Sequence, residues 1–298
     1  MKGSPFDWLR RVFYLIILFF LIIFLVRQGT EPWRIIAVHL PAFAAVMVIT
    51  ALGILIQANA FRMCLPDDVR SPSFLRLIDI WAISGITSLL APVIASLAMR
   101  TALLQRERVG LKACVLATAR QTWFNCECAL LISAIVLIIY PWPIIPSLGY
   151  GLLLVFLSFW LLRKCLLVYS GSYIKLHFPN LLRIAYSPSW QAFFWLWGQL
   201  IIMAVNYWAV FFLMSAPLKW YEGFLLAALT ILASLVVFIP NGLGILDALW
   251  VWIGSQRGLV LGESVALALI MRFGYLAAAT LLWFGLSRWQ KIHRAVGG

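Results

Sequence analysis

The chain has 298 residues, of which 64% are hydrophobic and only 11% carry a charge. This composition is typical of a polytopic membrane protein and excludes a water-soluble globular fold. A formal charge of +13 would suggest nucleic-acid binding in a soluble protein. Here the basic residues gather in predicted loops on one side of a membrane, so we expect no nucleic acid and predict attraction to anionic headgroups.

The N-terminal half is predicted to contain three spanning helices and one broken segment. Residues 12–26 and 35–56 are apolar stretches of spanning length, and the first is not followed by a small-residue cleavage site. After an aqueous loop at 63–79, the segment 81–99 contains Pro92 and several small polar residues, with arginines on both sides. A re-entrant hairpin keeps both basic flanks in the cytoplasm, so we predict one there. Residues 113–140 form the next spanning helix.

The C-terminal half repeats this alternation of spanning and broken segments. We predict spanning helices at 144–162, 192–214 and 264–286, and a second re-entrant segment at 223–253. The predicted outside segments then contain only Arg27, Arg34, Lys219 and Arg257 of the 23 basic residues. The sequence thus predicts a single all-α membrane domain over residues 1–298, with six spanning helices, two re-entrant hairpins and both termini in the cytoplasm.

The second re-entrant segment is interrupted by the string FIPNGLGILD at residues 238–247. Pro240 removes a backbone donor, and Gly242 and Gly244 permit a sharp turn around Asn241. Broken backbone at membrane depth is tolerated where protein or water satisfies its polar groups, so such a break usually lines a site. The alternative is an ordinary loop between two helices at the membrane surface.

A degenerate internal repeat relates the two halves, at about residues 35–140 and 144–286. Pro92 and Gly110 have the same separation as Pro240 and Gly258, and an arginine follows each pair in the next helix. The two hairpins enter from opposite faces in the predicted topology. An inverted repeat of this kind places its site near the midplane, where the broken helices meet.

Two strings resemble the paired signatures of the lysylphosphatidylglycerol synthase transmembrane family. They are PNGLGILDALWVWIGSQRGLVLGESVALALIMR at 240–272 and LLAPVIASLAMRTALLQRERVGLKACVLATAR at 89–120. The resemblance covers about residues 36–286 and implies the fold of the lipid-flipping domain found in the multiple peptide resistance factor, without the soluble synthase domain. It also implies a bacterial-type inner membrane. Asn241 and Asp247 stand where the family often has glycine and glutamate, and the first string lacks the typical glycines and acid.

Five ionisable residues are candidates for binding the substrate. Charges inside membrane segments are costly and tend to face a cavity or a partner. Arg120 and Glu127 lie two helical turns apart, about 10 Å, which is too far for a direct pair. Asp247 and Arg272 lie on different elements and are able to pair across the hairpin. Such a pair either holds the hairpin shut or releases the arginine to a lipid phosphate. The candidates are Arg100, Arg120, Glu127, Asp247 and Arg272.

Other side chains are predicted to be structural. Cys126 and Cys128 are interpreted as buried free thiols, because no histidine lies near them, and we expect no metal site and no cofactor. Six tryptophans near span ends are assigned to the aromatic belts of the membrane. They are Trp8, Trp33, Trp81, Trp142, Trp220 and Trp289.

Three functions remain open from the sequence. The first is a transporter that moves an anionic phospholipid or a polyprenyl-phosphate lipid between leaflets. The second is a membrane-embedded enzyme acting on lipid, although the chain has no HExxH or GxSxG motif. The third is a non-catalytic partner of a glycosyltransferase or synthase. The sequence does not decide between a monomer and a homo-oligomer.

Overall fold

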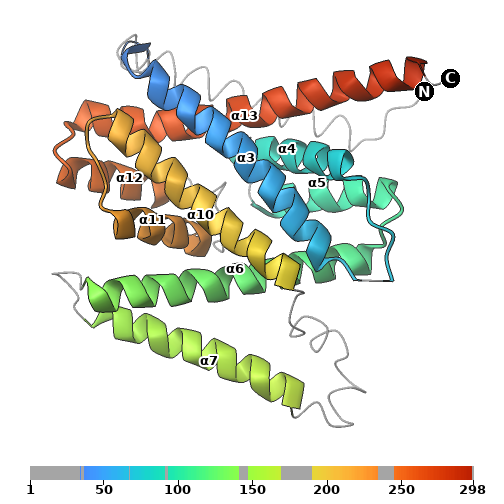
Figure 1. Cartoon of the computed structure of the whole chain (residues 1–298), viewed down its shortest axis with the longest axis horizontal. Helices are drawn as coiled ribbons and strands as arrows, with labels where there is room; N and C mark the ends of the chain where they lie inside the picture. The colour runs from blue at the N-terminus through green and yellow to red at the C-terminus, as the bar shows by residue number, and fades with distance from the viewer. Residues whose placement is uncertain are drawn as a thin grey trace.

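The computed structural model is helical throughout the residues that it describes, with no strand among them (Figure 1). These are residue 34 and residues 37–66, 68–90, 93–140, 147–168, 190–233 and 245–296. Several predicted features lie outside them, namely the span at 12–26 and all the proposed break residues. The break residues are Pro92, Pro240, Asn241, Gly242 and Gly244.

Within these ranges, five helices are long and apolar enough to cross a membrane. Each corresponds to one of the predicted spans, and the sixth prediction is the one at 12–26. Long apolar runs with few charges give these helices spanning length. A helix satisfies its own backbone groups, for which lipid offers no partner. The five are α3 (Leu40–Cys64), α6 (Leu111–Ile139), α7 (Leu148–Val168), α10 (Trp190–Leu213) and α13 (Leu261–Val296).

Two predicted boundaries in the N-terminal half are wrong. The helix predicted to end at Ile56 continues to Cys64, and the predicted loop at 63–79 contains the first turns of the next helix, which begins at Phe74. Asn59 and Arg62 do not end α3, because the neighbouring Phe61 is fully buried in the protein interior. The helix therefore continues for as long as its apolar side chains find partners.

Four shorter helices form two pairs. The first pair is α4 (Phe74–Leu90) and α5 (Val93–Arg106), and the second is α11 (Trp220–Ala233) and α12 (Ile245–Gln256). The Ser96 hydroxyl of α5 donates to the Ser84 carbonyl of α4 at 2.9 Å, so these two helices lie against each other. Figure 1 shows the first pair toward one end of the long axis and the second pair toward the other end.

An ion pair connects the outer ends of each pair of short helices. In the first pair, Arg76 Nε near the start of α4 lies 2.7 Å from the Glu107 carboxylate just beyond α5. In the second pair, Glu222 near the start of α11 bonds Arg257 just beyond α12. Both ion pairs join the start of the first helix to the end of the second. The arginine is on the first helix in one pair, and the glutamate is on the first helix in the other.

The two pairs also leave their second helix by the same turn. Arg108 and Gly258 both have positive φ, at 64° and 86°, and the apolar residue after each is buried, as in a Schellman ending. Gly258 is therefore in register with Arg108, and not with Gly110 as the sequence spacing indicated; Gly110 has a φ of −62°. The matching amide-to-carbonyl bonds are Val109 to Leu104 at 3.1 Å and Leu259 to Gly254 at 3.0 Å.

Buried side chains form two main clusters. One lies mainly among α10 through α13 and includes Phe211 and Leu267, but it extends to α3 and α6. The other lies mainly among α3 through α6 and includes Leu77 and Leu104, with Ala279 contributed by α13. Small residues permit close contact between helices, which is the main source of packing energy where lipid surrounds the protein. A Cβ on Gly274 of α13 would lie 2.6 Å from Val46 Cγ1 of α3.

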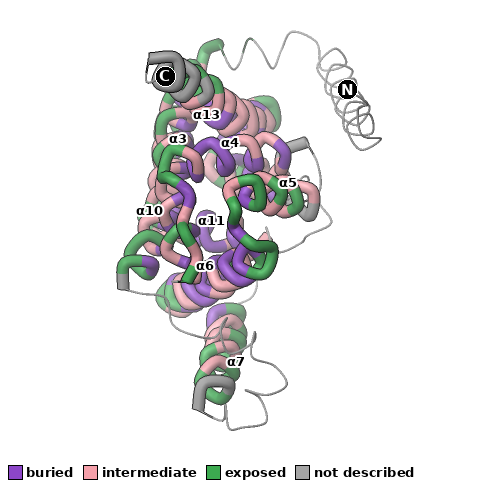
Figure 2. Tube along the Cα trace, turned by 90° about the vertical axis from the view of Figure 1, so that its right-hand side faces the viewer, coloured by how far each residue is buried: buried purple, intermediate pink, exposed green. Residues whose placement is uncertain are grey.

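Helix α7 lies at the edge of the molecule. It packs mainly against α6 and leaves most of its apolar side chains exposed (Figure 2). A helix that is apolar on its outer faces fits an acyl-chain environment and not water. The all-α architecture and the apolar spans are thus explained by a chain embedded in a membrane.

Candidate functional site

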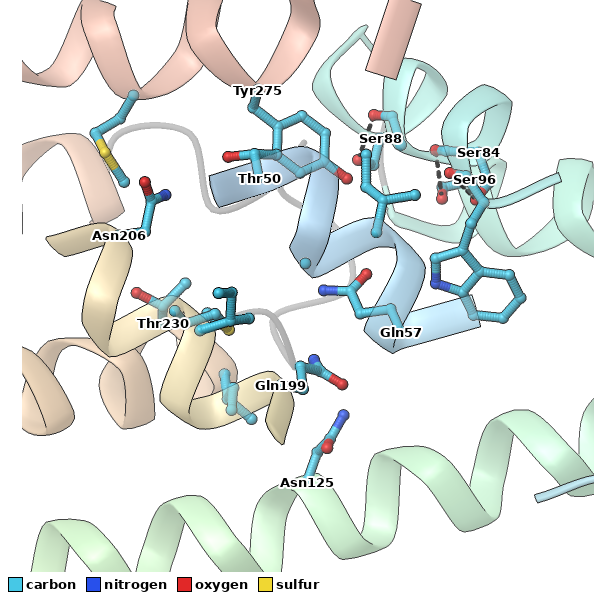
Figure 3. Close-up of a pocket in the computed structure, with 18 of the residues that line it drawn as sticks. Thr50, Gln57, Ser84, Ser88, Ser96, Asn125, Gln199, Asn206, Thr230 and Tyr275 are labelled. Carbon is cyan, nitrogen blue, oxygen red and sulfur yellow. Dashed lines mark hydrogen bonds between the residues drawn. The ribbon is translucent and has the colours of Figure 1, made fainter. Parts of the chain in front are cut away.

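A cavity of about 380 Å³ lies among the helices, and every labelled helix except α7 contributes to its wall. Members of both buried clusters line it, including Trp81 from one and Trp250 from the other. Figure 3 shows hydroxyl and amide side chains converging on this space from different helices. The neutral polar lining residues are Thr50, Gln57, Ser84, Ser88, Ser96, Gln121, Thr122, Asn125, Gln199, Asn206, Tyr207, Thr230 and Tyr275.

Several polar atoms at the wall have no hydrogen-bond partner among the described residues. They include Arg100 Nε, Gln199 Oε1 and Asn206 Oδ1, and all three of these atoms are buried. Other wall groups are bonded: the Tyr207 and Thr230 hydroxyls lie 2.6 Å apart. A buried polar group without a partner costs about 1–3 kcal/mol, so these three atoms mark where a polar ligand gains most.

Arg100 comes from α5 and lies over the face of an aromatic ring. Its Cζ is 3.9 Å from the centroid of the Trp81 ring, a close cation–π arrangement. No carboxylate among the described residues forms an ion pair with it. The assignment of Trp81 to a membrane belt is wrong, because this side chain is 3% exposed and packs under Arg100 and beside Phe61.

Arg272 comes from α13 and lines the same cavity, but unlike Arg100 it forms an ion pair. Its Nε and Nη2 atoms each lie 3.0 Å from an oxygen of Asp247, so the two side chains form a bidentate pair. The predicted pairing of Asp247 with Arg272 is thus confirmed, and it joins α12 to α13. Arg272 also lies over the Trp250 ring at 5.3 Å. Asp247 sits in the first turn of α12, where the helix dipole favours a carboxylate.

Arg120 and Glu127 belong to α6 but do not line the cavity. Arg120 Nη1 donates to the Cys64 carbonyl at the end of α3, at 3.4 Å, where a cation suits the carbonyl end of a helix. Glu127 accepts hydrogen bonds from Arg163 of α7 at 2.7 Å and from Trp123 at 3.1 Å. The two side chains do not pair with each other, as their spacing predicted, and each connects α6 to a neighbour.

The chemistry of the wall is that of a binding site. It combines two guanidinium groups with neutral hydroxyls and amides, and none of the described residues that line it is a carboxylate. In the described part of the chain, no three His, Cys, Asp or Glu residues gather closely enough to hold a metal ion. All five cysteines are free thiols, as predicted for Cys126 and Cys128.

Sequence reasoning missed most of the neutral wall residues. Gln57, Gln121 and Gln199 received no role, although each stands in a helix that is mostly apolar. Polar side chains inside membrane helices usually face protein, so this signal was present. Their convergence was not readable, because it depends on how helices distant in sequence are rotated against each other.

Comparisons with known proteins add no relative to this description. No protein-family model matches the chain, and neither the curated proteins nor the solved structures that were searched contain a match.

Proposed function

We propose that this protein is a flippase-like or scramblase-like transporter that moves an anionic phospholipid or a polyprenyl-phosphate lipid between the leaflets of a bacterial-type inner membrane. The observation that carries the proposal is a polar cavity with two arginines among helices apolar enough to span a bilayer. The headgroup is the costly part of a lipid to move, because a charge at the bilayer centre costs at least about 2.5–3.5 kcal/mol.

Each arginine has a distinct role in this proposal. Arg100 is available to a phosphate, because its guanidinium forms no ion pair with a described carboxylate. Arg272 is held by Asp247 while the site is empty and exchanges that carboxylate for a phosphate, which a guanidinium binds with the same two-pronged geometry. Asp247 then competes with the lipid for Arg272 and so favours release. The acyl chains remain in the bilayer throughout.

The proposal includes two re-entrant hairpins in an inverted repeat. Three observations support it: the short helix pairs lie toward opposite ends of the molecule, an ion pair connects the outer ends of each, and both leave by the same turn. Inverted repeats place their substrate site between the two broken elements, and both helix pairs contribute to the cavity wall. The resemblance to the lysylphosphatidylglycerol synthase transmembrane family is consistent with this arrangement.

Lipid translocation by Arg272 variants in proteoliposomes tests the proposed function. Arg272→Lys keeps the charge but loses the two-pronged geometry, so we expect translocation to fall by about tenfold. Arg272→Ala removes the charge as well and should leave little activity above protein-free vesicles. Arg288→Ala is the matched control, because Arg288 is an exposed arginine on the same helix.

The assay is interpretable only for protein that folds, so each variant is first compared by gel filtration and thermal unfolding in detergent. A wild-type rate in folded Arg272→Ala protein would remove this residue from the transport mechanism. Absence of translocation by the wild-type protein, across phosphatidylglycerol and a polyprenyl phosphate, would reject the transport proposal itself.

A further inference from the structure

The net charge around the cavity favours the binding of one anion and disfavours a cation. Arg100 and Arg272 line the wall, and no acidic side chain does among the residues that the structure describes. Because Asp247 neutralises Arg272, the net charge of these three residues is that of Arg100. One phosphodiester balances this charge. While Asp247 remains paired with Arg272, a headgroup ammonium has no other carboxylate on the described part of the wall to pair with, and it would lie near a guanidinium of the same sign.

The rest of the wall is suited to uncharged hydroxyl groups. Hydroxyl and amide side chains from seven helices face the space, and both donate and accept hydrogen bonds. The carbonyl oxygens of Gln199 and Asn206 are buried acceptors without a described partner. A hydroxyl satisfies such an acceptor without bringing a charge that must be removed from water, whereas an ammonium needs a compensating carboxylate.

We propose that the cavity selects lipids whose headgroup combines a single phosphodiester with an uncharged polyol, and discriminates against headgroups that carry an ammonium. This selection rests on the proposed transport function and names its substrate class. Two kinds of lipid share the chemistry: glycerophospholipids with a glycerol or inositol headgroup, and polyprenols joined to a sugar through one phosphate. The volume of about 380 Å³ falls in the range of about 300–1,000 Å³ usual for small-ligand pockets.

A panel of labelled lipids in proteoliposomes tests this selection. Phosphatidylglycerol, phosphatidylethanolamine and lysyl-phosphatidylglycerol with identical acyl chains differ only in the headgroup, which carries an ammonium in the last two. We expect phosphatidylglycerol to cross at least about tenfold faster than the other two. A polyprenyl phosphate carrying one hexose, compared with the bare polyprenyl phosphate monoester, distinguishes the second source. We expect the glycosylated diester to cross faster, because the monoester carries additional negative charge.

Three variants connect the selection to the cavity wall. Arg100→Gln should reduce phosphatidylglycerol translocation by about tenfold or more and remove the preference. Arg106→Gln is the matched control, because Arg106 is an exposed arginine on the same helix and does not line the cavity. Asn125→Asp adds a carboxylate to the wall and should raise the rate for phosphatidylethanolamine relative to phosphatidylglycerol. Gln57→Glu makes the same test from α3 if Asn125→Asp fails to fold.

Lipid retention measured by native mass spectrometry separates the selection from transport. Preferential retention of phosphatidylglycerol without translocation of any lipid would reject the transport function and support the selection. Equal translocation rates across the panel would reject the selection and leave transport standing. An unchanged preference in folded Arg100→Gln protein would overturn the assignment of the phosphate to Arg100. Neither retention nor translocation of any lipid would reject both.

Discussion

Two arginines on aromatic rings face one cavity, and their partners differ. Arg100 lies 3.9 Å from the Trp81 centroid without a described carboxylate, whereas Arg272 lies 5.3 Å from Trp250 and is held by Asp247. A cation–π contact stabilises a buried guanidinium by roughly 0.5–2 kcal/mol, less than a carboxylate partner offers in a desolvated site. Each half of the molecule therefore supplies one guanidinium stacked on a tryptophan. Arg100 is the more available to an anion, because no described carboxylate forms an ion pair with it.

Close contact between Gly85 and Tyr275 shapes the cavity wall and gives a prediction at the residue scale. A Cβ on Gly85 would lie 2.5 Å from Tyr275 Oη and 3.2 Å from the nearest ring carbons. We expect Gly85→Ala to lower the free energy of unfolding by about 1–3 kcal/mol through overpacking. Removing the hydroxyl with Tyr275→Phe should recover part of this loss in the double variant, measured by thermal unfolding in detergent.

The control for this prediction is Gly151→Ala on α7, where an added Cβ meets nothing within 4 Å. That change should be neutral or raise stability by up to about 1 kcal/mol, since alanine favours a helix over glycine. A Gly85→Ala protein as stable as the Gly151→Ala protein would contradict the contact.

At the scale of elements, contacts between their ends join the four short helices into two pairs. Each pair is connected at its outer end by an arginine–glutamate ion pair, and each second helix passes into a long helix through a turn with one residue at positive φ. The turn reverses the chain within a few residues and determines where α6 and α13 begin. The cavity residues of these long helices, such as Asn125 and Arg272, are therefore positioned by the turn that precedes them.

The residue with positive φ is an arginine in the first turn and a glycine in the second. Substitutions at these two positions should therefore change the free energy of unfolding in opposite directions. Arg108 adopts φ 64°, a conformation that costs an ordinary residue about 1 kcal/mol or more and glycine little. We expect Arg108→Gly to raise the free energy of unfolding by about 0.4–1 kcal/mol, and Gly258→Ala to lower it by about 1 kcal/mol. Equilibrium unfolding in detergent measures both.

Arg106→Gly is the matched control, because Arg106 is also exposed but lies two residues earlier in the α5 helix. There glycine should destabilise by about 1 kcal/mol. If Arg108→Gly and Arg106→Gly destabilise the protein equally, the positive φ at Arg108 is not what limits that turn.

At the scale of the whole molecule, two packed clusters meet around a polar space and present apolar surface outward. The exposed leucines of α7 and the buried amides at the cavity wall reverse the pattern of a water-soluble protein. This distribution explains why a chain that is 64% hydrophobic still contains a polar site. The interior holds the groups that lipid cannot solvate.

The predicted topology gives an accessibility prediction at this scale. Single cysteines replacing Arg70 and Arg106 should react with an impermeant thiol reagent from the cytoplasmic side, because a re-entrant hairpin returns the chain to its starting face. A cysteine at Lys219 should react only from the opposite side. The background has its five native cysteines replaced, which is feasible because all are free thiols. Labelling of positions 70 and 106 from opposite sides would show that the first helix pair crosses the membrane.

The sequence by itself determined the membrane class, the all-α architecture and five of the spanning helices, because these depend on long apolar runs that are read locally. It also indicated the pair between Asp247 and Arg272, since two charges in an apolar region have few alternatives to each other. It did not predict the extension of α3 to Cys64, because burial of Phe61 by distant helices overrides the local stop signals.

Only the tertiary structure decided which polar residues share a cavity. Arg120, Glu127 and Arg272 all lie well inside apolar segments of the sequence, yet Arg120 contacts α3 and Glu127 contacts α7. Glutamines and asparagines line the cavity instead of these two residues. The position of Trp81 near a predicted span end indicated a membrane-belt residue, but its ring packs under Arg100. Both outcomes depend on the rotation and crossing of helices that are far apart in the chain. That geometry results from the packing of all side chains together and not from any local pattern.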